Sequence, residues 1–360
     1  MDICEQENVI FSINYCPFLF KFVAYIIAMK KILISILFFD SFLAYSQGEA
    51  NFWYFSGTMG LDFNSGVPVP LFDGAHLTIE GSATISDASG NLLFYTNGAT
   101  IWNKNHAIML NGEGLTGNYS SVQSAIIVPK PGSVNIYYVF TVAAEIMAEG
   151  LKYSEVDMTL DGGLGAVTPN KNISLATPTT EGLTAVQHDN GVDFWVVSHG
   201  WGGSNSNAFY AYLVTASGVS ATPVVTNVGQ NLTGETFRSM MKISPDGRLL
   251  AQGSIYDSHM QLLKFDDATG ALSSPIQLPG SYYGIEFSPS GNVLYAREDL
   301  QGGQIYQFDL TAPDIAASKL NFATCPLCRG AGMQLGPDGK IYFIGNFSSN
   351  LSIIHNPEVI

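Results

Sequence analysis

Hydrophobic and polar residues alternate along several short segments of this chain. The alternation is clearest in residues 151–156, 208–213, 261–265 and 304–308. A period of two places successive side chains on opposite faces of an extended strand, so each segment predicts a β-strand with one packed face. The sequence shows no sustained helical periodicity. The pattern therefore predicts an all-β protein that is built from many short strands.

A glycine-containing turn recurs between pairs of these strands. In such a turn, proline presets φ at the second position, Asp or Asn bonds back to the backbone, and glycine accepts a positive φ. Each copy predicts a hairpin whose first strand is the inner strand of a sheet. The six anchor glycines are Gly90, Gly132, Gly191, Gly247, Gly291 and Gly339. The expected inner strands are residues 83–85, 125–128, 184–186, 241–243, 285–287 and 333–335.

The spacing of the turns indicates how the hairpins are arranged. Successive anchor glycines lie roughly 40 to 60 residues apart, which fits one four-stranded blade per repeat. A ring of blades leaves no open sheet edge if one end of the chain completes the blade at the other end. The last repeat lacks an outer strand, and residues 51–55 can supply it. We therefore predict a six-bladed β-propeller closed by the N-terminal strand, with seven blades as the alternative if more sequence follows Ile360.

The first residues of the chain do not share the repeat pattern. Residues 29–46 begin with a basic segment, continue with an apolar core and end in small residues. This order is typical of a secretory signal peptide, and we expect cleavage before Gln47. We interpret residues 1–28 as an over-extended reading frame. Residues 47–360 are then the propeller domain, which we expect to be truncated at its C-terminal end.

A membrane anchor in residues 9–43 is the alternative interpretation of the N-terminal segment. Asn14, Pro17, Lys21 and two further lysines interrupt this region, so no clean apolar stretch of about 20 residues remains. We expect no membrane-spanning segment in the mature chain.

Charge and motif content narrow the range of functions. The formal net charge is −15, and only 12% of the residues are charged. Such an acidic chain repels phosphate backbones, so nucleic-acid binding is not expected. The sequence contains no P-loop, no Gly-x-Ser-x-Gly and no zinc or calcium spacing. We therefore expect neither a cofactor nor a metal.

Several long motifs, in a fixed order, resemble a known family. They are residues 53–64, 83–98, 101–106, 123–132, 153–158 and 334–342. Together they resemble the N-terminal β-propeller region, with its WD40-like repeats, of Bacteroidota cell-surface proteins. Those proteins use type IX secretion and are described as gliding-motility-associated or type-B sorting-domain proteins. The resemblance covers about residues 51–356 and implies an exported protein, either extracellular or at the outer-membrane surface. The given sequence ends at Ile360 without a sorting domain, so we expect either a fragment or a protein that stays in the periplasm.

Candidate ligand-binding residues follow from the repeat register. Propeller ligands usually bind at one mouth of the central channel, where the inner strands begin. About ten residues before the anchor glycines, the expected ring is Glu80, Gln123, Glu181, Arg238, Tyr283 and Arg329. One interpretation is a polar funnel for a glycan, a polymer or a protein partner at the cell surface. The other is a structural network in which the two glutamates pair with the two arginines.

Two polar and aromatic loops add further candidates. Trp102 lies in one loop, and His199 and Trp201 lie in a second loop that is rich in Gly and Asn. An exposed Trp can stack on the face of a sugar. Alternatively, Trp102 fills a layer between blades and the second loop is only a connection.

We prefer a non-catalytic, exported binding or scaffold module. The alternative is a carbohydrate-active propeller enzyme in which Glu80 and Glu181 act as an acid and a base or nucleophile. That chemistry needs the two carboxyls about 5–10 Å apart.

Cys325 and Cys328 form a Cys-Pro-Leu-Cys sequence. A redox pair lacks the expected fold context, and a metal site lacks a second pair of cysteines. In an exported protein we expect a local disulfide between them.

Overall fold

The computed structural model describes residues 48–55, 57–145, 149–298, 303–325, 332–344 and 351–360. The chain divides into two compact units, Met1–Ser46 and Gln47–Ile360, and the described residues all belong to the second. The predicted signal peptide therefore lies outside the described residues. Among the described residues, no helix has the length and apolar character that a membrane span requires.

Nearly all regular structure in the described residues is β-strand, as the alternating pattern predicts. The strands form seven groups of consecutive antiparallel strands. The first group is β1 (Phe52–Tyr54), β2 (Gly60–Asp62) and β3 (Val69–Leu71). The second is β4 (Ala83–Ser86), β5 (Leu92–Thr96), β6 (Thr100–Asn103) and β7 (Ile108–Glu113). The third is β8 (Ala125–Pro129), β9 (Ile136–Val142), β10 (Leu151–Asp157), β11 (Ala166–Val167) and β12 (Ile173–Ala176).

The remaining four groups follow the same plan. The fourth is β13 (Thr179–Gln187), β14 (Phe194–Gly200), β15 (Ala208–Thr215), β16 (Gly218–Val219) and β17 (Val224–Asn227). The fifth is β18 (Ser239–Ile243), β19 (Leu249–Ser254), β20 (His259–Asp266) and β21 (Ala271–Pro279). The sixth is β22 (Tyr282–Phe287), β23 (Val293–Glu298), β24 (Gln304–Asp309) and β25 (Leu320–Thr324). The seventh is β26 (Met333–Leu335), β27 (Ile341–Ile344) and β28 (Leu351–Ile354).

Short 3-10 helices and one parallel contact complete the secondary structure. The helices are η1 (Gly48–Ala50), η2 (Asp161–Gly163), η3 (Gly203–Asn205) and η4 (Gly234–Phe237). A short parallel pairing of β7 with β11 joins the second and third groups into one nine-stranded sheet. We refer below to the seven groups as the first to the seventh sheet.

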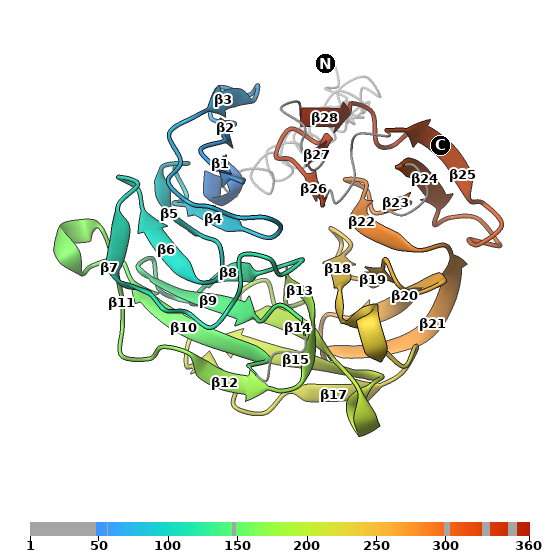
Figure 1. Ribbon diagram of the computed structural model, residues 1–360, viewed down its shortest axis with the longest axis horizontal. Coiled ribbons are helices and arrows are strands. Elements are labelled where there is room, and N and C mark those ends of the chain that lie inside the picture. Colours follow the sequence, from blue (N-terminus) through green and yellow to red (C-terminus); the bar gives the residue numbers. More distant parts are fainter. Residues whose placement is uncertain (1–47, 56, 146–148, 299–302, 326–331, 345–350) are drawn as a thin grey trace, which may run out of the picture. The chain divides into compact units, whose positions relative to one another are not determined.

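The strands that precede the recurring turns surround a common centre (Figure 1). These are β4, β8, β13, β18, β22 and β26, and each contains the inner strand expected from the sequence. All six anchor glycines have positive φ, between 70° and 83°. An L side chain is disfavoured in this region, which is why glycine recurs there. The turn chemistry thus fixes both the hairpins and the inner strands.

The hydrophobic core is divided among the interfaces between neighbouring sheets, as in a propeller. For example, one buried cluster joins Trp195 and Phe209 of the fourth sheet to Leu250 and Leu263 of the fifth. Similar clusters join the second and third, third and fourth, fifth and sixth, and sixth and seventh sheets. The third to sixth sheets therefore bury both of their faces against their neighbours.

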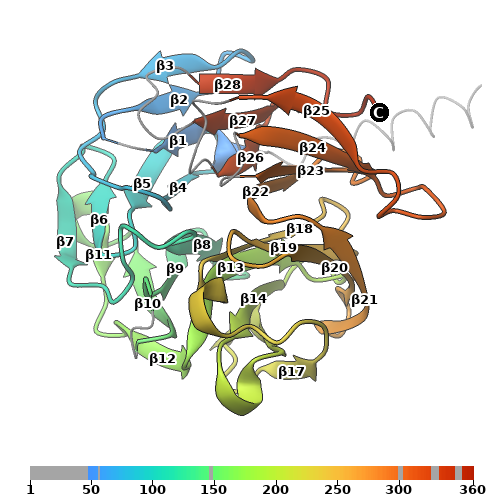
Figure 2. The same ribbon diagram turned by 45° about the vertical axis from the view of Figure 1, so that its right-hand side comes forward.

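The first and last sheets meet in a different way from the predicted strand exchange. β1 pairs with β2 of its own sheet, and β28 pairs with β27 in the described residues. Phe55 N–H donates to the Met59 carbonyl at 3.0 Å, and such a local hairpin costs little loop-closure entropy. The two sheets contact each other through side chains instead, because Leu61, Phe63 and Tyr342 form one buried cluster. Figure 2 shows β2 close to β28. The blade number of six is therefore not confirmed.

Candidate functional site

Among the described residues of the predicted mouth ring, Glu181 is the most deeply buried. It lies on β13, and only 1% of its surface is exposed. Its Oε2 accepts a hydrogen bond from the Val122 N–H at 2.8 Å, and its Oε1 accepts one from the Glu145 N–H at 2.7 Å. Glu145 has φ 57°, a conformation that costs a non-glycine residue about 1–2 kcal/mol. The carboxyl therefore ties β13 to the segments before β8 and after β9.

The environment of Glu181 changes its protonation. Burial is the main cause that raises its pKa to about 7, and the nearby Glu80 charge adds to this effect. The two backbone N–H groups and Arg238 act in the opposite direction because they stabilise the carboxylate. Near neutral pH, Glu181 is therefore a mixture of carboxylate and carboxylic acid.

Glu80 and Tyr283 meet although they are far apart in the sequence. The Tyr283 hydroxyl donates to Glu80 Oε1 at 2.8 Å. Glu80 precedes the second sheet, whereas Tyr283 lies on β22 of the sixth. This contact, and the effect of Glu80 on the pKa of Glu181, bring residues of three sheets together. The structure therefore brings together these three residues, which the register of the turns relates to one another.

Arg238 is the cation of this group. It follows η4, and its Nη1 donates to Glu235 Oε2 at 2.9 Å. Its Nη2 lies 3.7 Å from Glu145 Oε1. The guanidinium carbon lies 4.8 Å from the ring centre of Phe237 and 5.5 Å from that of Tyr256. With 29% of its side chain exposed, Arg238 combines ion pairs with cation–π contacts while remaining accessible.

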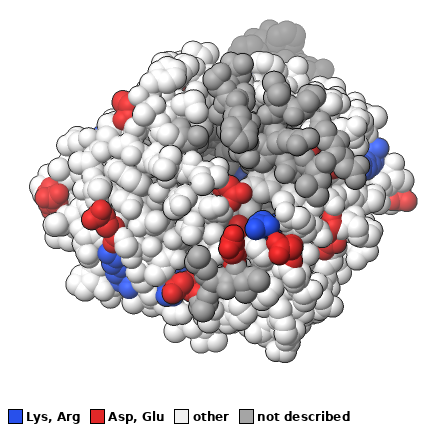
Figure 3. Space-filling model, viewed as in Figure 1, with Lys and Arg blue, Asp and Glu red and all other residues white. Residues whose placement is uncertain are grey.

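These residues form a polar cluster, which we call the channel mouth. The mouth comprises Glu80, Glu145, Glu181, Glu235, Arg238, Tyr256 and Tyr283. One of them, Tyr283, also packs with Val122 and Met240 in a buried apolar cluster. Figure 3 shows acidic side chains gathered around a basic one near the middle of this face. A few convergent polar groups next to apolar side chains are typical of a ligand site.

Gln123 has a structural position next to the mouth. Its Oε1 accepts hydrogen bonds from the Leu183 N–H at 3.0 Å and the Met241 N–H at 2.8 Å. Its Nε2 donates to the Met241 carbonyl at 2.9 Å. Both functional ends of the amide are therefore used to fasten β13 to β18, and little capacity is left for a ligand.

The loop candidates occupy different places. Trp201 is half-buried, donates from Nε1 to the Gly234 carbonyl at 3.1 Å and contacts the Phe237 ring edge-on at 6.5 Å. It therefore lies beside the Arg238 segment. Trp102 instead stacks on Tyr95 at 5.9 Å between the strands of the second sheet.

His199 lies inside the fourth sheet and not at the mouth. It is 0% exposed, its Nδ1 lies 2.6 Å from the Gly200 carbonyl, and it packs edge-on against Phe209. Burial lowers its pKa to about 4. Because the ring is fully buried, it is not accessible to a ligand in this structure.

Two predicted residues, Arg329 and Cys328, lie outside the described residues. Cys325 is disulfide-bonded. The other three cysteines of the chain also lie outside the described part, so pairing with Cys328 stays a prediction. Within the described part of the chain, no group of three or more His, Cys, Asp or Glu side chains is arranged to hold a metal.

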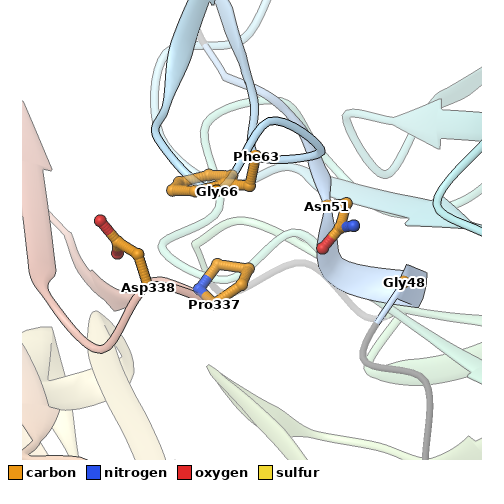
Figure 4. Close-up of a pocket in the computed structure, with 6 residues that line it drawn as sticks. All are labelled: Gly48, Asn51, Phe63, Gly66, Pro337 and Asp338. Carbon is orange, nitrogen blue, oxygen red and sulfur yellow. The ribbon is translucent and has the colours of Figure 1, made fainter.

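A separate cleft of about 270 Å³ lies where the first and seventh sheets meet. Its lining is Gly48, Asn51, Phe63, Gly66, Pro337 and Asp338. Figure 4 shows Phe63 and Pro337 between Asp338 on one side and Asn51 on the other. Burial alone would raise the pKa of Asp338, but hydrogen bonds from Lys340 and Tyr342 lower it below the usual value. No mouth residue lines this cleft.

Three members of the mouth do not follow from the register of the repeats. Glu145 lies in a connection between β9 and β10, Glu235 in η4, and Tyr256 after β19. Glu145 and Tyr256 do not lie about ten residues before an anchor glycine, so the repeat could not reveal them. Glu235 lies 12 residues before Gly247, just outside the register position that Arg238 occupies. A weaker signal is available in the sequence. Each of the three is an acidic or aromatic residue in a connection that lies on the same side of the sheets as the starts of the inner strands.

Comparisons with known proteins show the fold. No protein-family model matches the chain, and a search of curated proteins finds no match. Among solved structures, the chain is similar to the β-propeller domain of Cps50 (Swd1) from Myceliophteria thermophila. The identity is 12% and the TM-score is 0.51, over 85% of this chain and 95% of that one. The chain is therefore an all-β, propeller-like protein.

Two other matches have lower TM-scores. A protein from Lactobacillus plantarum is 14% identical with a TM-score of 0.48, over 85% of this chain and 90% of that one. Hydrazine synthase from Kuenenia stuttgartiensis is 14% identical with a TM-score of 0.46, over 83% of this chain and 89% of that one. Such low identities carry no information about activity.

Proposed function

We propose that this protein is an exported β-propeller that serves as a non-catalytic binding or scaffold module at the cell surface. Its ligand is a glycan, another polymer or a segment of a partner protein, held at the channel mouth. The observation that carries the proposal is the convergence of Glu80, Glu181, Arg238 and Tyr283 from different sheets, next to the buried apolar cluster that contains Tyr283. The propeller fold in general suits such a role.

Export and surface location are part of the proposal. The signal-like character of residues 29–46 supports it, and the compact unit begins at Gln47, the residue before which we expect cleavage. The resemblance to type IX-secreted, gliding-motility-associated proteins of Bacteroidota favours a place at the outer surface.

The number of blades belongs to the same proposal. The first and seventh sheets are separate, and their side chains pack together around Tyr342. This arrangement favours seven blades over the six expected from the sequence. The additional blade then comes from residues 52–71 and requires no sequence after Ile360.

Catalysis by Glu80 and Glu181 is the competing function. Its support is the raised pKa of Glu181, because a general acid at neutral pH needs such a value. Against it, Glu181 is 1% exposed and both of its oxygens accept backbone hydrogen bonds. A carboxyl in this position cannot reach a glycosidic oxygen without breaking those bonds. Turnover of an oligosaccharide that disappears in both Glu80→Gln and Glu181→Gln would restore the enzyme alternative.

A binding experiment tests the proposed function. The mature protein is applied to an array of neutral, uronic-acid and amino-sugar oligosaccharides, and then to the outer-membrane proteins of the native cell. Arg238→Ala removes a partly exposed guanidinium, and Arg residues at binding sites often contribute strongly to affinity. We expect this variant to weaken binding tenfold or more.

Arg248→Ala is the matched control. Arg248 is also an exposed arginine, but it follows the turn at the opposite end of β18 from Arg238. Its substitution should leave binding unchanged. Equal binding by wild type and Arg238→Ala, or equal losses in the two variants, would contradict a ligand site at the mouth.

A further inference from the structure

Residues 72–80 form a strap that crosses the junction between the first and second sheets. Asp73 Oδ1 accepts a hydrogen bond from the Tyr54 hydroxyl at 2.8 Å, and the Ala75 N–H donates to the Tyr95 hydroxyl at 2.9 Å. At the other end, the Ile79 and Glu80 N–H groups lie 3.0 and 3.3 Å from the Tyr119 carbonyl. The strap therefore has polar anchors at both ends.

His76 is the central anchor of the strap, and it is an unusual one. The residue is 1% exposed, and its ring packs against Tyr95 at 5.1 Å and Trp102 at 5.9 Å. Neither ring nitrogen has a hydrogen-bond partner among the described residues. An unsatisfied buried polar group costs about 1–3 kcal/mol. An apolar ring would fill the same space without this cost, so packing alone does not account for a histidine.

The groups around His76 offer its charged form no compensation. The elements packed against it carry Tyr54 on β1, Tyr95 on β5, Trp102 on β6, and Lys104 and His106 in the following turn; Asp73 belongs to the strap itself. Asp73 is engaged with Tyr54 and lies 3.6 Å from His106 Nε2. His106 Nδ1 lies 3.1 Å from the Tyr95 hydroxyl. Burial is the cause that lowers the pKa of His76 to about 4.

We propose that His76 makes residues 72–80 an acid-sensitive latch. The neutral imidazole fits the aromatic junction, whereas the imidazolium cannot be buried there without a partner and moves out to water. When the ring leaves, the strap loses its central anchor. Acid therefore opens the strap locally and leaves the rest of the propeller closed.

The latch is connected to the channel mouth by the chain itself. Glu80 is the last residue of the strap, and its carboxylate accepts the hydrogen bond from Tyr283. Opening of the strap therefore weakens the Glu80–Tyr283 contact. An effect on ligand binding rests on the proposed function, but the opening itself does not.

Hydrogen exchange of the free protein tests the latch. The probes are the hydrogen-bonded amides of Gly74, Ala75, Ile79 and Glu80, with protection factors corrected for the intrinsic pH dependence. A released histidine binds a proton with a pKa of about 6.5. Opening should therefore increase about 30-fold between pH 7.5 and pH 5, whereas amides of β18 and β22 should change far less. An increase below about twofold would overturn the proposal.

Two variants separate the latch from general acid sensitivity. His76→Phe keeps an aromatic ring but cannot be protonated, so its strap should show almost no pH dependence. His199→Phe removes an equally buried histidine from the fourth sheet and should leave the response of the strap unchanged. An unaltered response in His76→Phe would overturn the proposal.

A measurement on the wild-type protein does not depend on whether a variant folds. Nuclear magnetic resonance of the His76 ring should show the neutral form at pH 6 and protonation only near pH 4 to 5, together with strap exchange. Protonation near pH 6.5 without any loss of strap protection would also overturn the latch.

Discussion

Two junctions between neighbouring sheets are filled by different chemistry. Between the fourth and fifth sheets, Trp195, Phe209, Leu250 and Leu263 pack in a buried apolar cluster. Between the first and second sheets, Tyr54 stacks on Tyr95 at 4.7 Å, and His76, Asp73 and His106 complete the contact. The junction of the fourth and fifth sheets is thus built from side chains that do not titrate. The junction of the first and second sheets is built from side chains that do. The free energy of unfolding should therefore respond to cavities at the junction of the fourth and fifth sheets. At the junction of the first and second sheets it should respond to pH.

The largest expected effect is a cavity in the apolar junction. Leu250 is 0% exposed, and Leu250→Ala should lower the free energy of unfolding by about 2–5 kcal/mol. Because no titratable group is removed, the loss should be the same at pH 7.5 and pH 5.5. Urea unfolding followed by tryptophan fluorescence measures it. A loss below 1 kcal/mol, or one that depends strongly on pH, would show that this junction is not the apolar support described here.

Glu181 provides a buried titratable group that is fully hydrogen-bonded, in contrast to His76. Its pKa is raised to about 7 in the folded protein, so the folded state binds more protons than the unfolded state between about pH 4.5 and 7. Its contribution to stability is complete below pH 4.5 and is lost as the pH rises through 7. The expected size is about 3 kcal/mol. Glu181→Gln should remove this alkaline loss.

Glu145→Gln is the control for this prediction. Its side chain is 66% exposed, so the substitution changes the charge of the mouth without removing a buried carboxyl. Urea unfolding between pH 5 and pH 8.5 should show the wild-type pH dependence in this variant. A flat profile in Glu145→Gln, or an unchanged one in Glu181→Gln, would assign the dependence to another group.

His76→Phe should change how the free energy of unfolding falls at acid pH. The pKa of His76 is lowered to about 4 when the protein is folded, so its contribution is present above pH 6.5 and is lost as the pH falls toward 4. The loss in the wild type is about 3 kcal/mol at most. The variant should lack it and should be at least as stable as the wild type at pH 7.5. Thermal unfolding at pH 7.5, 6 and 5 gives the comparison, and a less stable variant at pH 7.5 would contradict the cost assigned to the unpartnered ring.

Tyr54→Phe should have the smallest effect at this junction. The substitution keeps the stacking on Tyr95 and removes only the hydrogen bond to Asp73, which is half-exposed. The expected loss is about 0.5–1.5 kcal/mol. Calorimetry at pH 7.5 measures it, and a loss similar to that of Leu250→Ala would show that the strap anchor carries far more stability than we infer.

The part of the fold that the sequence predicts is the part fixed by local chemistry. The turns at Gly90, Gly247 and Gly291 require positive φ, and each determines a hairpin without any knowledge of the rest of the chain. Their register then relates Glu80 to Tyr283, which the structure joins by a hydrogen bond. A repeated local signal can therefore predict a contact between distant residues.

The remaining features depend on packing between sheets, which leaves no periodic signal. β2 is only three residues long and contains Gly60, so no alternation reveals that it pairs with β1. His76 is a single histidine in a segment with no repeat partner, and its burial depends on Tyr95 and Trp102 of the neighbouring sheet. His199 looked accessible because of the Gly- and Asn-rich loop after it, but the strand before that loop buries it.

The central claim is that the channel mouth binds the ligand. Hydrogen exchange of the wild type, with and without the oligosaccharide or protein that binds it most tightly, tests this claim most directly. We predict added protection at the amides of Val122, Glu145 and Met241, around the mouth, and no change in the outer strands β17 and β21. Protection confined to the outer strands, with the mouth unchanged, would contradict the account.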